Sequence, residues 1–451
     1  MDIWPILGEI SLASLIVFFL AFSLYSLLEK ELRAFGISSI FFLLLLLTSI
    51  GLFFLEEPLR SWTFGSAFAL VFLFVLFTLF PPLKKHSTAI VGEQKRVDER
   101  DVIFARFEYQ EGTEIFEDYY KRKPEYKRID DEIREIPDIL SPFHTKKDPW
   151  HFSLAAAEFD FLEHQFTQVS GSVRDIKLTS SAYENTRKIK SIIEYLGSDV
   201  CGICSLNQVY LYSHVGRGPE PHGSAIDLKH KFAIVFAVEM DLGMVRVAPH
   251  APVIVETAKR YVEAARISII LAHLIRRLGY PARAHIAGSN YQAVLPPLGW
   301  EAGIGELGRL GILITYKYGP RARLGLVTTD LPLIPDRPKA FGVQDFCQKC
   351  QKCARNCPAQ AIPYGEKVEE NGVLKWVLKR EECYRFWRKV GTDCALCIFV
   401  CPYSKPHNLF HSVIRKMTER SSAAQTLSVW GDDFFYGSSP RHHGSPFDIR
   451  P

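Results

Sequence analysis

The sequence predicts an α/β protein with three apolar helices near its N-terminus and a cysteine-rich domain near its C-terminus. Three observations predict this class. The first 85 residues contain three uncharged apolar runs, each long enough to cross a bilayer. Helix-like and strand-like apolar patterns alternate between about residues 175 and 335. Eight of the ten cysteines then fall between residues 347 and 401.

The N-terminal apolar runs are Ile10–Leu28, Ile37–Leu55 and Trp62–Phe80. At a rise of about 1.5 Å per residue, each helix is roughly 28 Å long, close to the thickness of the hydrocarbon core. Three such runs with short polar breaks indicate a transmembrane anchor over residues 1–85, and not a cleavable signal peptide.

Basic residues beside these runs predict their orientation. Lys30 and Arg33 lie in the first loop, and Lys84-Lys85 follow the third run. The positive-inside rule therefore places the N-terminus outside and the large domain in the cytoplasm. On the opposite side, Glu56-Glu57 are either carboxylates that line a quinol site or interfacial carboxylates that cap a span.

Residues 86–174 are rich in charged and aromatic side chains, which predicts an irregular segment with isolated helices that wraps over the next domain. The core follows over residues 175–335. Its clearest elements are helices at Asn185–Leu196 and Pro252–Leu278 and a buried strand at Lys231–Met240. Shorter strands are expected at Ala282–Ala287, Ile312–Thr315 and Leu324–Thr328.

Two cysteines of the core, Cys201 and Cys204, form a Cys-Gly-Ile-Cys sequence. They are either a redox pair or two small side chains buried at the end of a strand. A glycine-rich stretch, Gly299–Gly311, allows the backbone to approach a bulky ligand or another backbone closely. It contains the pattern G-x-G-x-x-G but precedes a strand, so it does not predict a dinucleotide site.

The cysteine-rich domain is expected over residues 336–410. Its cysteines follow the pattern C-x2-C-x2-C-x3-C-P, then one isolated cysteine, then C-x2-C-x3-C-P. This spacing is typical of two 4Fe–4S clusters that exchange their fourth ligands. The exchange assigns Cys347, Cys350, Cys353 and Cys401 to one cluster, and Cys383, Cys394, Cys397 and Cys357 to the other. Residues 411–451 are expected to be a C-terminal tail.

Disulfide bonds and structural zinc suit these cysteines less well. A disulfide framework is not expected in a chain without a secretory signal. Zinc ribbons use two C-x2-C pairs, and this pattern has three cysteines within seven residues. The net charge of +4 gives no argument for a nucleic-acid partner. The sequence therefore predicts a protein that transfers single electrons.

Several motifs in this order resemble those of the corrinoid-dependent reductive dehalogenases. The resemblance covers roughly residues 98–410. It rests on Asp98–Arg106, Tyr119-Tyr120, Glu239-Met240, Tyr261 on a helix that ends Arg276–Tyr280, Ala302–Arg309, Gly319-Pro320-x2-Arg323, Thr329–Leu333 and Phe346-Cys347.

The resemblance implies a nitroreductase-like fold that binds a base-off cobamide, with two clusters that deliver electrons to the cobalt. It implies that Tyr261 donates the proton to the carbon that loses its halide, and that Arg323 stabilises the phenolate beside it. It also implies that Asn290 lies near the substrate, and that Gly303, Gly305, Glu306 and Gly308 belong to the corrinoid loop. Glu306 is expected to orient backbone there. The gap from Cys383 to Cys394 is longer than in a plain duplicated ferredoxin, so the loop of the second cluster is enlarged. Trp387 either stacks near the substrate or fills this enlarged cluster loop.

The resemblance further implies a small organohalide substrate and an electron donor that is a quinol, a ferredoxin or a flavoprotein. Well-known members of the family use a separate membrane protein of three spans, whereas here the three spans precede the catalytic part in one chain. Two alternatives remain open. One is an epoxyqueuosine reductase-like enzyme that modifies tRNA, and the other is a non-catalytic iron–sulfur subunit that transfers electrons.

Overall fold

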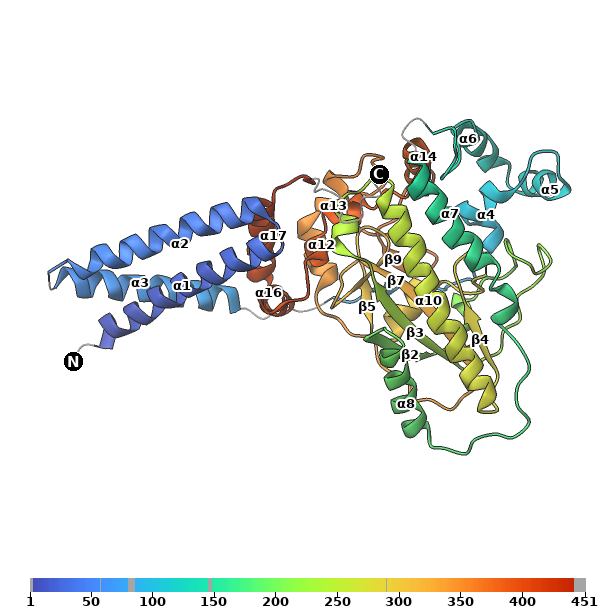
Figure 1. Cartoon of the computed structure of the whole chain (residues 1–451), viewed down its shortest axis with the longest axis horizontal. Helices are drawn as coiled ribbons and strands as arrows, with labels where there is room; N and C mark the ends of the chain where they lie inside the picture. The colour runs from blue at the N-terminus through green and yellow to red at the C-terminus, as the bar shows by residue number, and fades with distance from the viewer. Residues whose placement is uncertain (1–2, 57, 80–85, 145–147, 289, 442–451) are drawn as a thin grey trace. The chain divides into compact units, whose positions relative to one another are not determined.

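The computed structural model describes residues 3–56, 58–79, 86–144, 148–288 and 290–441. The chain divides into two compact units (Figure 1). The first unit joins Met1–Lys85 to Pro406–Ser439, and the second joins His86–Lys405 to Pro440–Pro451.

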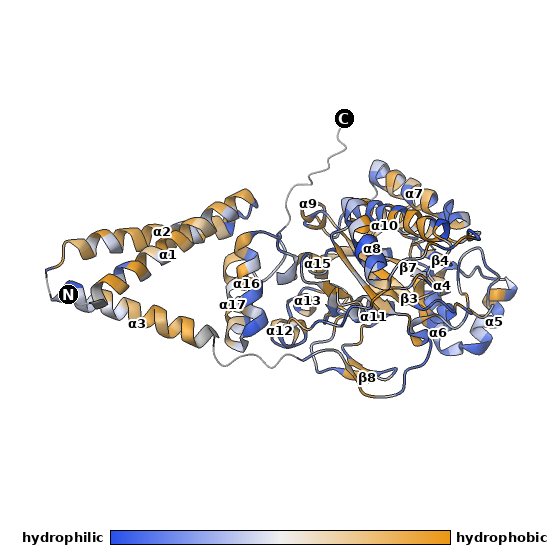
Figure 2. Ribbon diagram, turned by 90° about the horizontal axis from the view of Figure 1, so that it is seen from below, coloured by the Kyte–Doolittle hydropathy of each residue, from blue (hydrophilic) through white to orange (hydrophobic). Residues whose placement is uncertain are grey.

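The first unit contains three long apolar helices, coloured mostly orange in Figure 2: α1 (Ile3–Leu28), α2 (Leu32–Phe53) and α3 (Leu59–Leu79). Within them, Ile6–Leu28, Leu32–Phe53 and Leu59–Leu76 are long and apolar enough to cross a membrane. These segments overlap the three predicted runs. Glu57, Phe80, Lys84 and Lys85 lie outside the described residues.

Two further helices belong to the first unit, in the stretch expected to be a tail: α16 (Leu409–Arg420) and α17 (Ser422–Tyr436). Each begins at a residue whose side chain accepts a hydrogen bond from the first turn. The side chain of Asn408 accepts from the backbone N–H of His411, and the hydroxyl of Ser421 accepts from that of Ala424.

The second unit is built around an antiparallel sheet of four strands in the order β2-β3-β7-β4. The strands are β2 (Val200–Ser205), β3 (Phe232–Glu239), β7 (Ala322–Thr329) and β4 (Ala282–His285). The predicted strands at Lys231–Met240, Ala282–Ala287 and Leu324–Thr328 correspond to β3, β4 and β7. The predicted strand at Ile312–Thr315 becomes β6 (Leu313–Thr315), which pairs with β5 (Gly305–Leu307) in a separate ribbon.

Helices cover both faces of the main sheet. Ile234, Phe236 and Val238 of β3 face one core with α8 (Ala182–Tyr195) and α10 (Pro252–Arg277). Their neighbours Ala233, Val235 and Ala237 face the opposite core with α11 (Leu295–Glu301). Because alternate side chains of a strand point to opposite faces, burial on both faces explains why β3 is apolar throughout.

Cys201 and Cys204 both lie in β2 but face opposite sides of the sheet. Cys201 packs against the α10 core, whereas Cys204 is buried in the α11 core. Burial raises the pKa of the Cys201 thiol to about 11 and that of the Cys204 thiol to about 12. Two protonated thiols on opposite faces favour a packing role over a redox pair.

Short helices precede the sheet: α4 (Ile103–Glu108), α5 (Glu114–Arg122), α6 (Pro124–Arg134) and α7 (Pro149–Glu163). A buried ion pair fixes this segment, since Nη2 of Arg106 lies 2.5 Å from the carboxylate of Asp130. Nη1 of Arg106 also contacts Glu381, 3.0 Å away in the cysteine-rich part.

The cysteine-rich part contains α12 (Val343–Cys350), α13 (Lys352–Arg355), α14 (Arg380–Val390) and α15 (Leu396–Phe399). Between α13 and α14, the hairpin of β8 (Val368–Glu370) and β9 (Val373–Lys375) pairs with β1 (Ala89–Ile90) from the start of this unit. The remaining helix, α9 (Leu242–Val245), packs against α10 and α15.

Candidate functional site

The eight cysteine thiols of residues 347–401 fall into two neighbourhoods. The thiol of Cys401 interacts electrostatically with those of Cys347, Cys350 and Cys353. The thiol of Cys394 interacts with those of Cys383 and Cys357. The thiol of Cys397 interacts with those of Cys394, Cys383 and Cys357. It also interacts with that of Cys353, so the two groups lie next to each other.

The two groups share a backbone geometry. Gln351, between Cys350 and Cys353, has a φ of 51°, and Ala395, between Cys394 and Cys397, has a φ of 48°. This left-handed conformation is uncommon for residues other than glycine and is retained where the surrounding structure requires it. Gln351 directly precedes the single helical turn α13, and Ala395 directly precedes the single helical turn α15. These two turns pack against each other.

Backbone N–H groups point at several of these sulfurs. The N–H of Ala361 donates to the Cys357 sulfur over 3.3 Å. The N–H groups of Leu396 and Tyr403 donate to Cys394 and Cys401. Hydrogen bonds to cysteine sulfurs stabilise the negative charge of an iron–sulfur cluster.

Eight thiols in two groups of four form the donor set that two cubane clusters require. Among the described residues, no three His, Cys, Asp or Glu side chains converge closely enough to hold one ion. In a cubane, each cysteine binds a different iron, so its ligands stand further apart than those of one ion. This grouping of the thiols is compatible with the crossed ligand assignment, which stays a prediction.

Glu306 connects the glycine-rich stretch to the first cysteine helix. Its side chain is fully buried, and Oε2 accepts hydrogen bonds from the backbone N–H groups of Phe341 and Val343 at 2.7 and 3.2 Å. Burial raises the pKa of this carboxyl to about 7. Glu306 therefore orients the backbone at the start of α12.

Packing within the chain accounts for Gly303, Gly305 and Gly308, the three glycines expected in the corrinoid loop. A Cβ on Gly303, whose φ is +71°, would lie 2.4 Å from the carbonyl oxygen of Arg337. A Cβ on Gly305 or Gly308 would lie within 2.6 Å of Ile314. Contact of these glycines with a corrinoid stays a prediction.

Tyr261 and Arg323 line one cavity of about 230 Å³. Tyr261 comes from α10, Arg323 from the start of β7, and the remaining walls are mostly apolar or aromatic. These walls are formed by Tyr212, Tyr291, Ala293, Val294, Leu295, Pro296, Ile312, Leu313, Ala322 and Leu324. The guanidinium carbon of Arg323 lies 5.2 Å from the centroid of the Tyr261 ring.

Two residues hold Arg323 above this ring. Its Nη2 donates to the hydroxyl of Thr257 over 2.8 Å and to the carboxylate of Asp393 over 3.3 Å. The hydroxyl of Thr257 in turn donates to Asp393 over 2.6 Å. Thr257 precedes Tyr261 by one helical turn, so both side chains lie on the face of α10 that packs on β7. Asp393 directly precedes the cluster cysteine Cys394.

The cavity contains polar groups suited to a ligand. Within the described part of the chain, the buried Nε of Arg323 has no hydrogen-bond partner. Burial raises the pKa of the Tyr212 phenol to about 12 and raises that of Tyr291 further, so both stay neutral. The volume suits a small substrate and one edge of a larger cofactor. A whole cobamide is larger than this cavity.

Asn290 does not join Tyr261 and Arg323 among the described residues that line the cavity. Its amide oxygen accepts a hydrogen bond from Nη2 of Arg283 over 3.0 Å, and its buried Nδ2 has no partner in the described structure. Its neighbour Tyr291 does line the cavity, so the 290–292 segment forms one wall.

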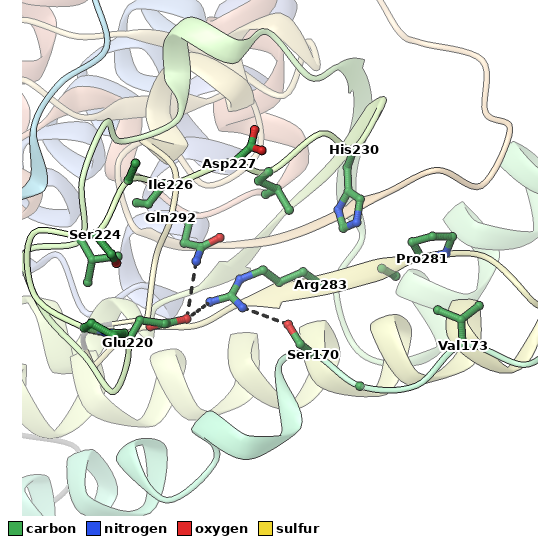
Figure 3. Close-up of a pocket in the computed structure, with 16 residues that line it drawn as sticks. Ser170, Val173, Glu220, Ser224, Ile226, Asp227, His230, Pro281, Arg283 and Gln292 are labelled. Atoms are coloured by element: carbon green, nitrogen blue, oxygen red, sulfur yellow. Dashed lines mark hydrogen bonds and ion pairs between the residues drawn. The ribbon is translucent and has the colours of Figure 1, made fainter.

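A second cavity, of about 380 Å³, is lined by Gln292 of the same segment (Figure 3). Arg283 crosses it and donates to the Ser170 hydroxyl over 2.9 Å and to the Glu220 carboxylate over 2.8 Å. Gln292 also points toward Glu220. Arg283 pairs with Glu220 in this cavity, and the buried Nε of Arg283, like that of Arg323, has no hydrogen-bond partner among the described residues.

Trp387 lies on α14 in a cluster with Phe104 and Tyr384, with ring centroids 6.0 and 6.4 Å away. Its side chain also hydrogen-bonds the cluster cysteine Cys383. These contacts favour the view that Trp387 fills the enlarged cluster loop.

Residues that sequence reasoning missed complete the site. Thr257 and Asp393 position Arg323, and Tyr291 forms a wall. Arg309 is fully buried and donates to the carbonyl oxygens of Cys347, Pro363 and Gly365. Only Thr257 carried a sequence signal, its spacing of one helical turn from Tyr261.

Comparison with known proteins agrees with this arrangement. Residues 346–405 match the 4Fe–4S dicluster domain family. The tetrachloroethene reductive dehalogenase of Dehalobacter restrictus is 32% identical over 300 residues, which cover 55% of this chain and 54% of that protein. Over about half of its length, the chain is therefore similar to reductive dehalogenases.

A solved catabolic reductive dehalogenase in complex with 3-bromo-4-hydroxybenzoic acid gives a TM-score of 0.62 at 25% identity. The match covers 80% of this chain and 50% of that chain. The epoxyqueuosine reductase of Listeria monocytogenes is 33% identical over 116 residues, which cover 25% of this chain and 29% of that protein. The present chain spans about half the length of the curated dehalogenases that it matches.

Proposed function

We propose that this protein is a membrane-anchored reductive dehalogenase that replaces a carbon-bound halogen by hydrogen. One observation carries the proposal. Tyr261 and Arg323 share a substrate-sized cavity, and Arg323 is bonded to Asp393, the residue before Cys394. In this proposal Tyr261 is the proton donor and Arg323 is the cation beside it. Both lie next to the loop that carries Cys394, as the reaction requires.

The reaction balances as RX + 2e⁻ + H⁺ → RH + X⁻. Bound beside this cavity, a reduced cobamide would supply the electrons that break the carbon–halogen bond. The Tyr261 hydroxyl gives its proton to the carbon that loses the halide, and the guanidinium of Arg323 stabilises the phenolate that forms. The apolar walls exclude water and favour binding of an organohalide.

Cys347, Cys350, Cys353 and Cys401 would hold one 4Fe–4S cluster and Cys383, Cys394, Cys397 and Cys357 the other, and the two clusters would supply single electrons to the site. The donor is a quinol, a ferredoxin or a flavoprotein. In this proposal α1, α2 and α3 anchor the enzyme in the cytoplasmic membrane, and the positive-inside rule puts the catalytic unit on the cytoplasmic face. Lys30, between α1 and α2, and Arg33, in the first turn of α2, support this orientation.

Replacement of the tyrosine tests the proposed chemistry. Tyr261→Phe keeps the ring and removes the proton, and we expect halide release to fall by about 100-fold or more. Iron and cobalt per chain should be unchanged. Tyr195→Phe is the control, because Tyr195 is 88% exposed on α8. Full turnover by Tyr261→Phe would refute the role of the tyrosine.

Metal analysis separates the alternatives. The partial match to an epoxyqueuosine reductase favours a second candidate, an enzyme that acts on a modified tRNA base. Both enzymes should bind cobalt when cells are supplied with cobamide, and halide release from a panel of organohalides then identifies the dehalogenase. Iron without cobalt would instead indicate a non-catalytic electron-transfer subunit.

A further inference from the structure

The first unit carries a helical hairpin whose exposed face the proposed dehalogenation does not use. We call α16 and α17 together, residues 409–436, the C-terminal hairpin. We propose that this hairpin lies in the headgroup region of the membrane and binds the surface of anionic phospholipids through α16. The inference rests on the proposed insertion of α1–α3 and goes beyond the catalytic function.

Aromatic side chains attach the hairpin to the apolar helices. The ring of Phe22 on α1 stacks on Phe410, with centroids 4.6 Å apart, and meets Phe435 edge-on at 4.8 Å. Phe41 on α2 lies 6.4 Å from both Phe434 and Phe435. Phe22 is only 3% exposed, so the hairpin covers this part of the anchor.

Polar contacts fix the depth of the hairpin. Asn408 donates to the carboxylate of Glu29 over 2.6 Å, and Nε2 of His411 lies 3.1 Å from it. Nε of Arg33 donates to the carbonyl oxygen of Phe434 over 3.1 Å. Glu29 and Arg33 flank the turn between α1 and α2, and charged residues are excluded from the hydrocarbon centre. The hairpin is therefore level with the headgroups.

The direction of the hairpin agrees with this depth. In Figure 1, α16 and α17 run across the ends of α1–α3 and not along them. A helix in this orientation lies parallel to the membrane plane, as interfacial helices do.

The exposed face has the composition of an interfacial helix. Leu409 and Val413 are 72% and 49% exposed, and Lys416 and Arg420 continue the same stripe of α16. Trp430 of α17 is 62% exposed. Tryptophan is enriched at membrane interfaces, and basic residues near the surface attract anionic headgroups.

Fluorescence quenching in lipid nanodiscs tests the depth of Trp430. The emission of each tryptophan is the fluorescence of the full-length protein minus the fluorescence of the variant in which that tryptophan is replaced by phenylalanine. Lipids brominated near the carbonyl groups should quench about half of the Trp430 emission, and lipids brominated near the chain ends should quench less.

Two matched tryptophans serve as controls. Trp62 at the start of α3 is 76% exposed and reports whether the spans are inserted, and Trp150 on α7 is 69% exposed and should stay unquenched. Quenching of Trp62 without quenching of Trp430 would overturn the proposed position of the hairpin and would leave the membrane anchor standing. No quenching of Trp62 would refute the membrane anchor as well, while catalysis is tested separately by Tyr261→Phe.

The basic residues test the lipid class. Hydrogen exchange of α16 should be slower in nanodiscs with phosphatidylglycerol than in those with phosphatidylcholine alone. The double variant Lys416→Gln with Arg420→Gln should lose this difference, whereas Lys121→Gln on the exposed face of α5 should keep it. Equal exchange of the unmodified protein in both lipids would overturn the anionic preference.

Discussion

Replacement of Arg323 by methionine should slow dehalogenation by between roughly tenfold and 100-fold. The guanidinium carbon lies 5.2 Å from the Tyr261 ring centroid. At an effective dielectric constant of about 20, a unit charge at this distance stabilises a phenolate by about 3 kcal/mol. Asp393, 3.3 Å from the guanidinium, offsets part of this energy. Since about 1.4 kcal/mol corresponds to a factor of ten, the loss should fall in the range given.

The assay is halide release under anaerobic conditions with an excess of chemical reductant, which removes any dependence on the natural donor. Arg323→Lys keeps the charge and should lose less activity than Arg323→Met. The solvent isotope effect should increase in Arg323→Met, because proton transfer becomes slower relative to other steps. Wild-type turnover with an unchanged isotope effect, at equal iron and cobalt content, would refute the electrostatic role of Arg323.

Three other predictions concern the scaffold. Cys401→Ser and Cys347→Ser should perturb the same cluster signal in electron paramagnetic resonance, and changes in two different signals would contradict the crossed ligands. Burial lowers the pKa of His285 far below its usual value near 6.5, so below about pH 6.5 only the unfolded state gains the proton and stability falls. The protection factor of the backbone amide of Gln292, which donates to Nδ1 of His285, should then be smaller at pH 5.5 than at pH 7.5 after correction for the intrinsic exchange rate at each pH. Gly303→Ala should destabilise the protein by about 1–3 kcal/mol in thermal unfolding, while Gly365→Ala, where a Cβ meets nothing within 4 Å, should not.

The long periodic elements were predictable from sequence. Pro252–Leu278 was expected as a helix and α10 ends at Arg277, because proline favours the first turn and Gly279 follows the end. β3 lies within the predicted Lys231–Met240, since burial on both faces leaves a continuous apolar run. β2 was not predicted, because its cysteines and glycine resemble neither alternating nor continuous strand patterns.

The site was predictable only in part. The cysteine spacing is local and points directly to clusters, whereas Tyr261 and Arg323 were singled out by resemblance and not by periodicity. Asp393 lies 70 residues from Arg323 in the chain, and a distant partner of this kind leaves no local pattern. The packing of α16 and α17 on α1 and α2 also joins residues that are far apart in the chain, such as Phe22 and Phe410, and no local pattern indicates it.

The pairing of α1–α3 with α16 and α17 has a consequence for biogenesis. The ribosome completes α3 at residue 79 and does not reach α16 until residue 409. At about 5–20 residues per second, the spans spend roughly 20–60 s without their aromatic partners, while the whole catalytic unit emerges between them. Premature termination after residue 405 should therefore leave a catalytic unit with all eight cluster cysteines and an anchor that is prone to degradation.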